Sequence, residues 1–421
     1  MHCGVKMTFV RKLSFVLNTL LIFSIVFDPY NYLFHIKNIA FVLFLLSSLP
    51  FIECKYYYVP LVFLSVFFVS LSFGILTNQN LSNESTMSML KSFLFLTYIF
   101  WMPCEYLKTS KVFYCVCFLL SILQIILFVV LIFFPESLMF FTLFLNKGEE
   151  ATLLIGIRNY YGIELPMIFY KTCPLLVLPL GISVSNFLQK KTVKNFLHFA
   201  VFAFGFFISG TRADMLSCVT LIFATVLFYH FYYKREVFFT AVFSSAFLFV
   251  FLLAVVFLLT ANDYSTNIKS GHLSSFMNMF GENPLKFLLI GNGPVSYMYT
   301  SARNEWVTLT ELTYLELIKN FGLIQSLLVV GILFLPVFFI CKNKSYERIQ
   351  KFSLSLSYVA YLFICGTNPL LISSTGFTAL AVAFSFGNGT AFKNLEQKKQ
   401  VKYVSETKRL LFKSSFNGEE I

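Results

Sequence analysis

The sequence predicts an all-α fold: a polytopic integral membrane protein of about 12 transmembrane helices with one large extracytoplasmic loop. Of its 421 residues 57% are hydrophobic and only 12% are charged, whereas soluble domains carry about 25% charged residues. The apolar residues fall in runs close to the roughly 20 residues that a membrane helix needs. Polar residues gather mainly in three places, residues 135–166, 260–312 and 393–421. We therefore expect residues 1–421 to form a single membrane domain, interrupted by two outer loops.

The apolar runs predict twelve helices. Their expected ranges are 13–34, 38–53, 56–76, 92–107, 112–134, 168–188, 195–210, 214–233, 237–260, 318–341, 352–367 and 369–390. The first run follows Lys6, Arg11 and Lys12, as in a signal peptide. Since no small-x-small cleavage site comes after it, we interpret it as a retained helix.

The charge distribution predicts the orientation. The chain carries 32 Lys and Arg against 20 Asp and Glu, and membrane proteins concentrate basic residues in their cytoplasmic loops. With both termini in the cytoplasm, most basic residues fall in cytoplasmic segments, including the tail at 393–421, and the two long polar loops lie outside. Because no basic stripe with stacking residues lies outside the apolar runs, the net charge does not indicate a nucleic-acid partner.

The sequence predicts no metal and no cofactor. Its nine cysteines are scattered, Cys115 and Cys117 are too close together for a zinc pair, and His272 has no second His at metal spacing. It contains no Walker, GxSxG or HExxH pattern.

Arg212 is the first candidate for a functional side chain. It lies in Ser-Gly-Thr-Arg-Ala-Asp, residues 209–214, between two apolar runs, where an Arg is costly and usually functional. The alternative is a helix-end Arg that pairs with Asp214 or reaches lipid headgroups. Gly210 permits a turn, and a hydroxyl of the motif can cap the next helix. A helix N-terminus beside an Arg suits a phosphate.

The loop at 135–166 contains a second candidate, Arg158, followed by Tyr160 and Tyr161. Glycines bracket this stretch and allow close approach to a ligand, and aromatic faces can stack on sugar rings. The alternative is an aromatic belt at the membrane interface.

The loop at 260–312 carries four cationic candidates: Lys269, His272, Lys286 and Arg303. For each one taken alone, the sequence favours a solvated loop charge over a functional side chain. It also contains Gly291-Asn292-Gly293-Pro294, either a plain turn or a nest of backbone donors that faces a phosphate. At its end, Glu311 and Glu316 open the next helix. The helix dipole favours a carboxylate there, and Glu311 could also act as a base.

Together these residues resemble the O-antigen polymerase and O-antigen ligase superfamily. The resemblance in architecture spans nearly the whole chain. It rests on the motif at 209–214, the large outer loop, the Gly291–Pro294 turn, and the glutamate-bearing start of the helix that leads to Gly322. The ligase branch usually has a His–Asn pair where this sequence has Glu311-Leu312, so the resemblance favours a polymerase. Arginines in two outer loops, Arg158 and Arg303, match the polymerases in kind, although the family's spacing to a downstream Gly does not recur.

The resemblance implies a membrane glycosyltransferase that needs no metal. It would join repeat units linked to undecaprenyl diphosphate at the outer face of the bacterial cytoplasmic (inner) membrane, for O-antigen (lipopolysaccharide) or capsular polysaccharide biosynthesis. The expected partners are the lipid-linked oligosaccharide, the bilayer, a chain-length regulator and a flippase.

We expect the following roles on this basis. Arg212 and Arg303 bind the diphosphate, and Glu311 deprotonates the acceptor hydroxyl. The substrate-binding set comprises Arg158, Tyr160, Tyr161, Lys286, Gly291 and Gly293.

Two other functions stay open. An O-antigen ligase would differ only in its acceptor. A flippase for the same lipid-linked unit would have several charges inside its helices and short outer loops, which is the reverse of this sequence.

Overall fold

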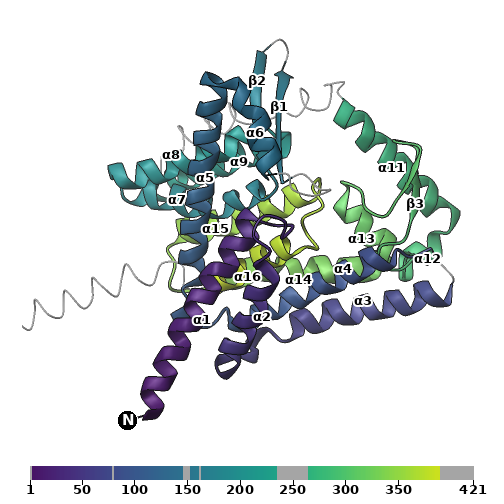
Figure 1. The fold of residues 1–421 in the computed structure, drawn as a ribbon, viewed down its shortest axis with the longest axis horizontal. Helices are drawn as coiled ribbons and strands as arrows, with labels where there is room; N and C mark the ends of the chain where they lie inside the picture. The colour runs from purple at the N-terminus through teal and green to yellow at the C-terminus, as the bar shows by residue number, and fades with distance from the viewer. Residues whose placement is uncertain (1, 78–79, 146–151, 161–162, 235–263, 389–421) are drawn as a thin grey trace, which may run out of the picture.

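The computed structural model describes residues 2–77, 80–145, 152–160, 163–234 and 264–388, and within this part the chain is predominantly helical (Figure 1). The α-helices are α1 (His2–Phe27), α2 (Lys37–Ser48), α3 (Tyr58–Leu76), α4 (Asn83–Leu94), α5 (Thr109–Phe133), α6 (Leu138–Leu145), α7 (Val177–Gln189), α8 (Val193–Ile208), α9 (Arg212–Tyr229), α11 (Tyr264–Glu282), α12 (Pro284–Leu289), α13 (Thr313–Phe321), α14 (Leu323–Lys342), α15 (Arg348–Cys365) and α16 (Ser374–Gly387). The strands are β1 (Leu153–Tyr160), β2 (Ile163–Tyr170), β3 (Met298–Thr300) and β4 (Glu305–Val307).

In the described part of the chain, five helices are long and apolar enough to cross a membrane. They are Thr8–Phe27, Tyr58–Leu76, Glu105–Phe133, Arg212–Tyr233 and Leu323–Lys342. Shorter apolar helices accompany them, among them α7, α8 and α16. These helices are those of a membrane protein, and the number of twelve spans stays a prediction. The predicted helix at 237–260 and the tail at 393–421 lie outside the described residues.

Several predicted helices have other bounds in the structure. The apolar run at 92–107 is not one helix: α4 ends at Leu94, and a 3₁₀ helix, η3 (Phe95–Trp101), follows. The helix predicted at 318–341 begins at Leu323, because Gly322 has a φ of +77° and separates α13 from α14. The helix predicted at 168–188 begins at Val177, after the 3₁₀ helix η6 (Cys173–Leu176).

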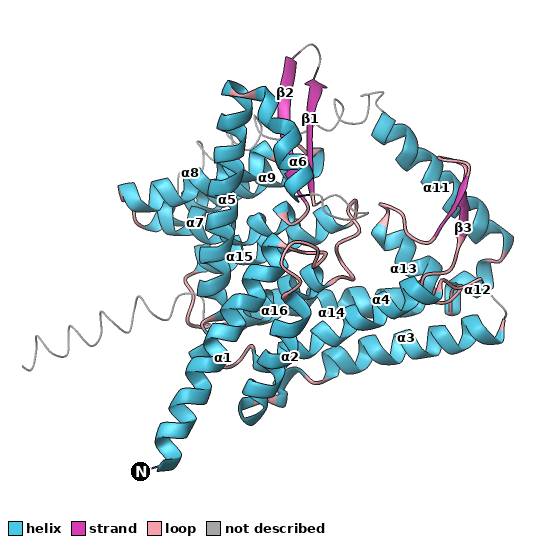
Figure 2. Cartoon of the chain, viewed as in Figure 1, coloured by secondary structure: helices cyan, strands magenta, loops and turns pink. Residues whose placement is uncertain are grey.

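The segment at 135–166 contains α6 and most of a β-hairpin that the sequence analysis missed (Figure 2). Strands β1 and β2 pair antiparallel from Leu153 opposite Tyr170 to Tyr160 opposite Ile163. Arg158 is opposite Leu165 in this register, and Tyr161 lies outside the described residues. The hairpin replaces the first residues of the helix predicted to start at 168.

The segment at 260–312 is also ordered into regular elements. It contains α11, α12 and the short β3–β4 hairpin, with Met298 opposite Val307. Helix α11 packs closely on the end of β3, since a Cβ at Gly271 would lie 2.8 Å from the Cα of Ala302. His272 Nδ1 lies 2.7 Å from Thr300 Oγ1 in the same contact. This segment lies to one side of the helical body, whereas the β1–β2 hairpin lies beside α5 and α6 (Figure 1).

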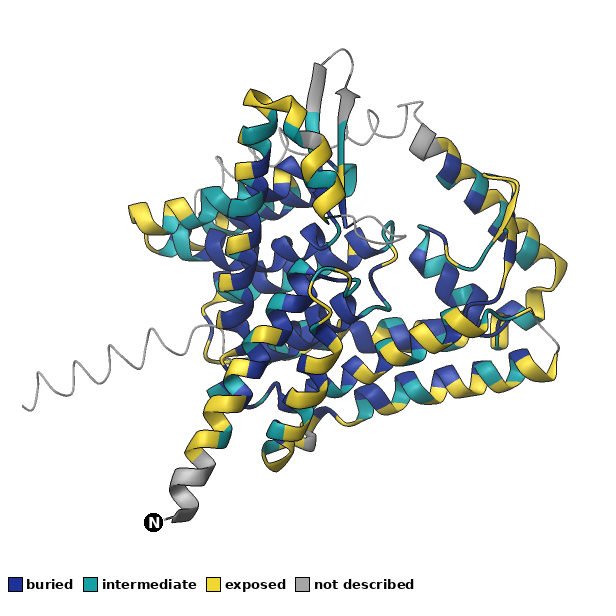
Figure 3. Cartoon of the chain, viewed as in Figure 1, coloured by how far each residue is buried: buried dark blue, intermediate teal, exposed yellow. Residues whose placement is uncertain are grey.

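Most residues of α7 and α16 are buried, and α15 packs against α7 (Figure 3). Ser353 Oγ on α15 donates to the carbonyl oxygen of Gly181 on α7 at 2.7 Å, and a Cβ on Gly181 would lie 2.7 Å from the Cβ of Ser357. Small residues therefore bring these two helices together. By contrast, α3 and α14 expose large apolar side chains such as Leu61 and Leu327, which a bilayer would cover.

Candidate functional site

A cavity of about 330 Å³ brings four charged side chains together. They are Lys171 after β2, Arg212 at the start of α9, Lys269 on α11 and Glu311 in the loop before α13. Apolar side chains of the β1–β2 hairpin, Leu154, Met167 and Phe169, form another part of the wall. The remaining lining residues are Thr211, Ala213, Thr367, Asn368 and Pro369. Segments far apart in the sequence thus converge on one site.

Arg212 is positioned by a sharp turn and a helix cap. Gly210 has a φ of +64°, a conformation that L-residues adopt only at a cost. Thr211 Oγ1 then accepts a hydrogen bond from the backbone N–H of Asp214 at 3.2 Å, which confirms the predicted cap. Asp214 itself is buried and accepts from Ser209 Oγ at 3.0 Å. Asp214 therefore faces the interior, and Arg212 lines the cavity.

The electrostatics of the cavity favour an anion. Three cationic side chains face one carboxylate, and the N-terminus of an 18-residue helix adds the positive end of its dipole. Backbone N–H groups at such an end have no partner within the helix and can bind phosphate oxygens.

Glu311 is held in the cavity by its loop. The backbone N–H of Leu312 donates to Thr310 Oγ1 at 3.3 Å. Thr313 Oγ1 donates to the carbonyl oxygen of Asn368 at 3.0 Å, which ties the loop to the segment between α15 and α16. Lys269 Nζ lies 3.5 Å from Glu311 Oε2, and both side chains are partly exposed. The carboxylate therefore remains accessible from the cavity.

Lys171 was not singled out from the sequence. Its backbone N–H donates to the carbonyl oxygen of Thr152 at 2.9 Å, which closes the base of the hairpin, and its Nζ lies 5.7 Å from the ring centre of Tyr30. The signal was present in the short apolar run from Met167 to Tyr170, rich in strand-forming residues, which places Lys171 at a strand end.

Two cationic residues that were predicted to belong to the site, Arg303 and Lys286, do not line this cavity in the described part of the chain. Arg303 is half-exposed in the turn between β3 and β4, where its guanidinium lies 3.6 Å from the carboxylate of Glu305. Lys286 is on α12 with its Nζ 5.9 Å from the ring centre of Phe287, and burial lowers the pKa of Lys286. The predicted pairing of Arg303 with Arg212 at one diphosphate site is thus absent, and Lys171 and Lys269 stand beside Arg212 instead.

The Gly291–Pro294 turn has a packing role. The N–H groups of Gly291, Asn292 and Gly293 donate to the carbonyl oxygens of Lys286, Lys319 and Asn320 at 2.9, 2.7 and 3.2 Å. A Cβ at Gly291 would lie 2.6 Å from the carbonyl oxygen of Lys319. These amides are already bonded, so the structure does not support the phosphate nest expected at Gly291 and Gly293.

For Arg158 and Tyr160 on the hairpin, the structure gives the backbone position in the strand register. Arg158 and Tyr160 lie further along β1 than Leu154, toward the turn and away from the strand end that lines the cavity. Tyr161 lies outside the described residues. The role expected for these three residues therefore stays a prediction.

Within the described part of the chain, no group of three or more His, Cys, Asp or Glu is arranged to hold a metal ion. Comparison of the chain with protein families, with curated proteins and with solved structures found no match. The function therefore has to be inferred from the chemistry of the site.

Proposed function

We propose that the chain is a polysaccharide polymerase that joins repeat units carried on undecaprenyl diphosphate at the outer face of a bacterial cytoplasmic membrane. The observation that carries this proposal is the cavity that Lys171, Arg212 and Lys269 line together with Glu311. A glycosyl transfer from a lipid diphosphate needs these two kinds of group: cations for the departing diphosphate and a base for the acceptor.

Each charged residue then has a defined role in one step. The acceptor hydroxyl oxygen attacks the anomeric carbon of the donor glycan and transfers its proton to Glu311. The bond between that carbon and the diphosphate oxygen breaks, and the lipid diphosphate leaves with the electron pair. Arg212, Lys171 and Lys269 stabilise the negative charge that develops on it. Arg212 can bind two phosphate oxygens with its planar guanidinium, whereas the lysines act as point charges.

The surroundings of the cavity suit a lipid-linked substrate. Leu154, Met167 and Phe169 give it an apolar wall, and Arg212 begins a helix of membrane-spanning length. An anion-binding site at the end of such a helix lies near the headgroup level, where the diphosphate of a polyprenyl lipid would also lie. We further propose that both termini are cytoplasmic, which fusions of a periplasm-active reporter to each end would test.

Deletion of the gene in its host, followed by gel analysis of the surface polysaccharide, tests the function. A ladder that collapses to core plus a single repeat unit, and that returns with the wild-type gene, is the expected result. Loss of all glycan from the core with long polymer on the carrier lipid would instead indicate a ligase. Single units trapped on the cytoplasmic side would indicate a flippase. An unchanged ladder in a host without a second copy would refute all three functions.

A further inference from the structure

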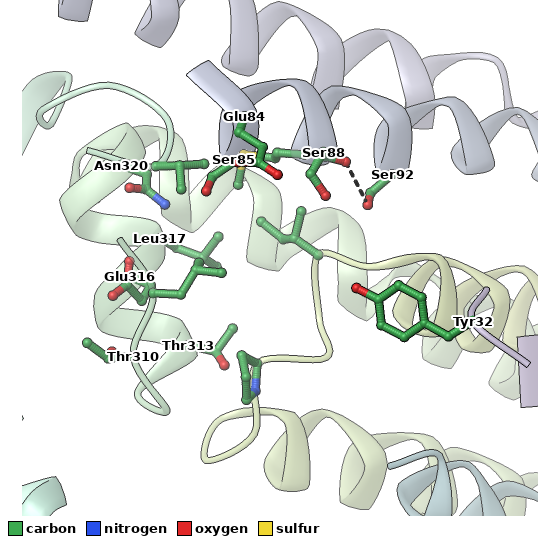
Figure 4. A pocket seen from close by; sticks show the side chains of 15 residues that line it. Tyr32, Glu84, Ser85, Ser88, Ser92, Thr310, Thr313, Glu316, Leu317 and Asn320 are labelled. Carbon is green, nitrogen blue, oxygen red and sulfur yellow. Dashed lines mark hydrogen bonds between the residues drawn. The ribbon is translucent and has the colours of Figure 1, made fainter. Parts of the chain in front are cut away.

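A second cavity, of about 340 Å³, is lined by residues of α4 and α13 (Figure 4). Pro369 lines both cavities, and the consecutive residues Thr310 and Glu311 are divided between them. Thr310 lines the second cavity and Glu311 lines the cationic cavity. The loop before α13 and the segment before α16 therefore form a shared wall between two neighbouring sites.

Hydroxyl groups from α4 form one side of this second cavity. Ser85, Ser88 and Ser92 all line it, and their spacing places them on one face of the helix. Figure 4 shows these serines opposite Thr313 of α13, with the hydroxyl end of Tyr32 turned toward the cavity from a third direction. A ligand there would meet hydrogen-bonding groups on several sides.

The α13 side contains a buried amide whose oxygen lacks a partner. Asn320 is 2% exposed and lines the cavity, and its Oδ1 has no hydrogen-bond partner among the described residues. Buried polar atoms in folded proteins are nearly always paired, because an unpaired one carries the full cost of leaving water. This oxygen is itself enclosed by the protein, and the rest of the amide side chain adds a polar group to the cavity wall.

The neighbouring Glu316 does not leave a free charge in the cavity. Its Oε2 lies 2.8 Å from Lys319 Nζ, and Lys319 also donates to the carbonyl oxygens of Ser296 and Thr308, both at 2.9 Å. Lys319 is fully buried behind Glu316 and does not line the cavity. The ion pair is thus neutral overall, and the two carboxylate oxygens of Glu316 are enclosed by the protein.

The charged residues that line the two cavities differ, so the cavities suit different ligands. Among the described residues that line the second cavity there is no Lys, Arg or His, and its two carboxylates belong to Glu316 and to the exposed Glu84. A phosphate or another anion is disfavoured there. The serine and threonine hydroxyls, together with the exposed carboxylate of Glu84, are the groups that recognise a neutral ligand with many hydroxyls.

We propose that the second cavity binds the sugars of the acceptor repeat unit, beside the cationic cavity that binds the donor diphosphate. This assignment of the acceptor rests on the proposed polymerase function. The volume is within the range of pockets that hold small ligands. A sugar bound against Thr310 lies next to Glu311, the residue proposed to take the proton from its hydroxyl.

The test is a binding measurement on the full-length protein in lipid nanodiscs. The probe is the soluble repeat-unit oligosaccharide released from the host's own polysaccharide, without lipid or diphosphate. Calorimetry on wild type, Ser85→Ala/Ser88→Ala and Asn320→Leu measures its Kd. We expect Asn320→Leu to weaken binding by about 3- to 10-fold and the serine double variant by about 10- to 100-fold, since each lost hydrogen bond is worth about a factor of 3 to 10.

Two further variants isolate the site. Ser65→Ala on α3 removes an exposed serine hydroxyl that lines neither cavity, so its Kd should match wild type. Arg212→Ala should retain oligosaccharide binding and lose polymer synthesis. The serine double variant stays informative if Asn320→Leu fails to fold, because Ser88 is exposed and Ser85 only partly buried.

The outcomes separate this proposal from the proposed function. Oligosaccharide that does not bind wild type, or binds all variants equally, overturns the acceptor site even if the deletion strain loses its polymer. Binding that requires a divalent cation, and disappears with a chelator, also overturns it in favour of a cation site. An unchanged polysaccharide ladder with intact, serine-dependent sugar binding would refute the polymerase and leave a sugar-binding cavity.

Discussion

Lys269 Nζ lies 3.5 Å from Glu311 Oε2, and this ion pair joins α11 to the loop that leads into α13. The two side chains are 35% and 42% exposed, so the pair contributes little to folding stability, in the range of about 0–1 kcal/mol. Its consequence is positional. It places a cation that can contact a phosphate directly beside the carboxylate that is proposed to accept a proton.

Replacing Glu311 by Gln should lower polymer synthesis by about 10²-fold or more, because the amide keeps the shape but cannot accept the proton. Incorporation of labelled repeat units by membranes from the complemented deletion strain measures the effect. Glu305→Gln is the matched control, since Glu305 is an exposed glutamate that lines neither cavity. Equal activity in the Glu311 variant and wild type would remove this residue from the reaction.

Replacing Arg212 by Ala should abolish visible polymer, and Arg212→Lys should restore a part of it. The lysine returns the positive charge without the bidentate geometry of the guanidinium. The length distribution of the polysaccharide ladder is the measurement. Arg303→Ala is the matched control and should retain most polymer, because Arg303 lies outside the cavity and pairs with Glu305 at 3.6 Å. Loss of polymer in Arg303→Ala but not in Arg212→Ala would instead indicate that the diphosphate binds at the β3–β4 turn.

Replacing Gly210 by Ala should destabilise the protein by about 1–3 kcal/mol and reduce activity. The φ of +64° is unfavourable for Ala, and the new Cβ would lie 2.5 Å from Met167 Cγ on β2. The start of α9 would then shift relative to the hairpin, and Arg212 with it. Thermal unfolding of the purified protein in detergent measures the stability.

Gly331→Ala on α14 is the control for this experiment. A Cβ at Gly331 would meet no described atom within 4 Å, and Ala favours the helix by up to about 1 kcal/mol. An unfolding temperature equal to or above that of wild type is expected. If both substitutions lowered it equally, the close contact at Gly210 would not be the cause.

His272 should make folding stability depend on pH. The side chain is 3% exposed, and burial, followed by the nearby Arg303, lowers the pKa of His272, although Glu311 and other carboxylates oppose the shift. The unfolded chain therefore binds a proton at about pH 6.5, where the folded His272 resists it. Its contribution is fully present above about pH 6.5 and is lost as the pH falls below that value.

Thermal unfolding of wild type and His272→Gln across pH 5 to 8 tests this expectation. The Gln side chain can still hydrogen bond to Thr300 but does not titrate. The difference in unfolding temperature between the two proteins should shrink as the pH falls below about 6.5. Parallel profiles over the whole range would show that His272 does not titrate differently in the folded state.

The apolar helices were predictable because their length and composition are local properties of the chain. Periodicity did not reveal the β1–β2 hairpin, since Gly156, Gly162 and Pro166 suggested an irregular loop. The alternation of Ile155, Ile157 and other large apolar residues was the signal for a strand. This alternation is a weak signal for a two-stranded hairpin, because such a hairpin is marginally stable by itself and depends on packing against other elements.

The candidate site was predictable where a residue type is unusual for its surroundings. Arg212 stood out between two apolar runs, and Glu311 stood out at a helix start. Lys269 was one of four loop cations with nothing to distinguish it, and Lys171 was not singled out. A lysine near a loop is ordinary, and only tertiary structure brings these two to Arg212. Arg303 looked equivalent in the sequence, yet the β3–β4 turn directs it to Glu305.

The shared wall between the two cavities has a consequence for insertions and deletions. Thr310 and Glu311 are neighbours in the chain and belong to different cavities, so the number of residues between β4 and α13 sets which side chain belongs to which. Losing one residue there would move each side chain by one position and exchange a hydroxyl for a carboxylate. The loop should therefore tolerate a change of residue type at Leu312, which lines neither cavity, far better than any change in its length.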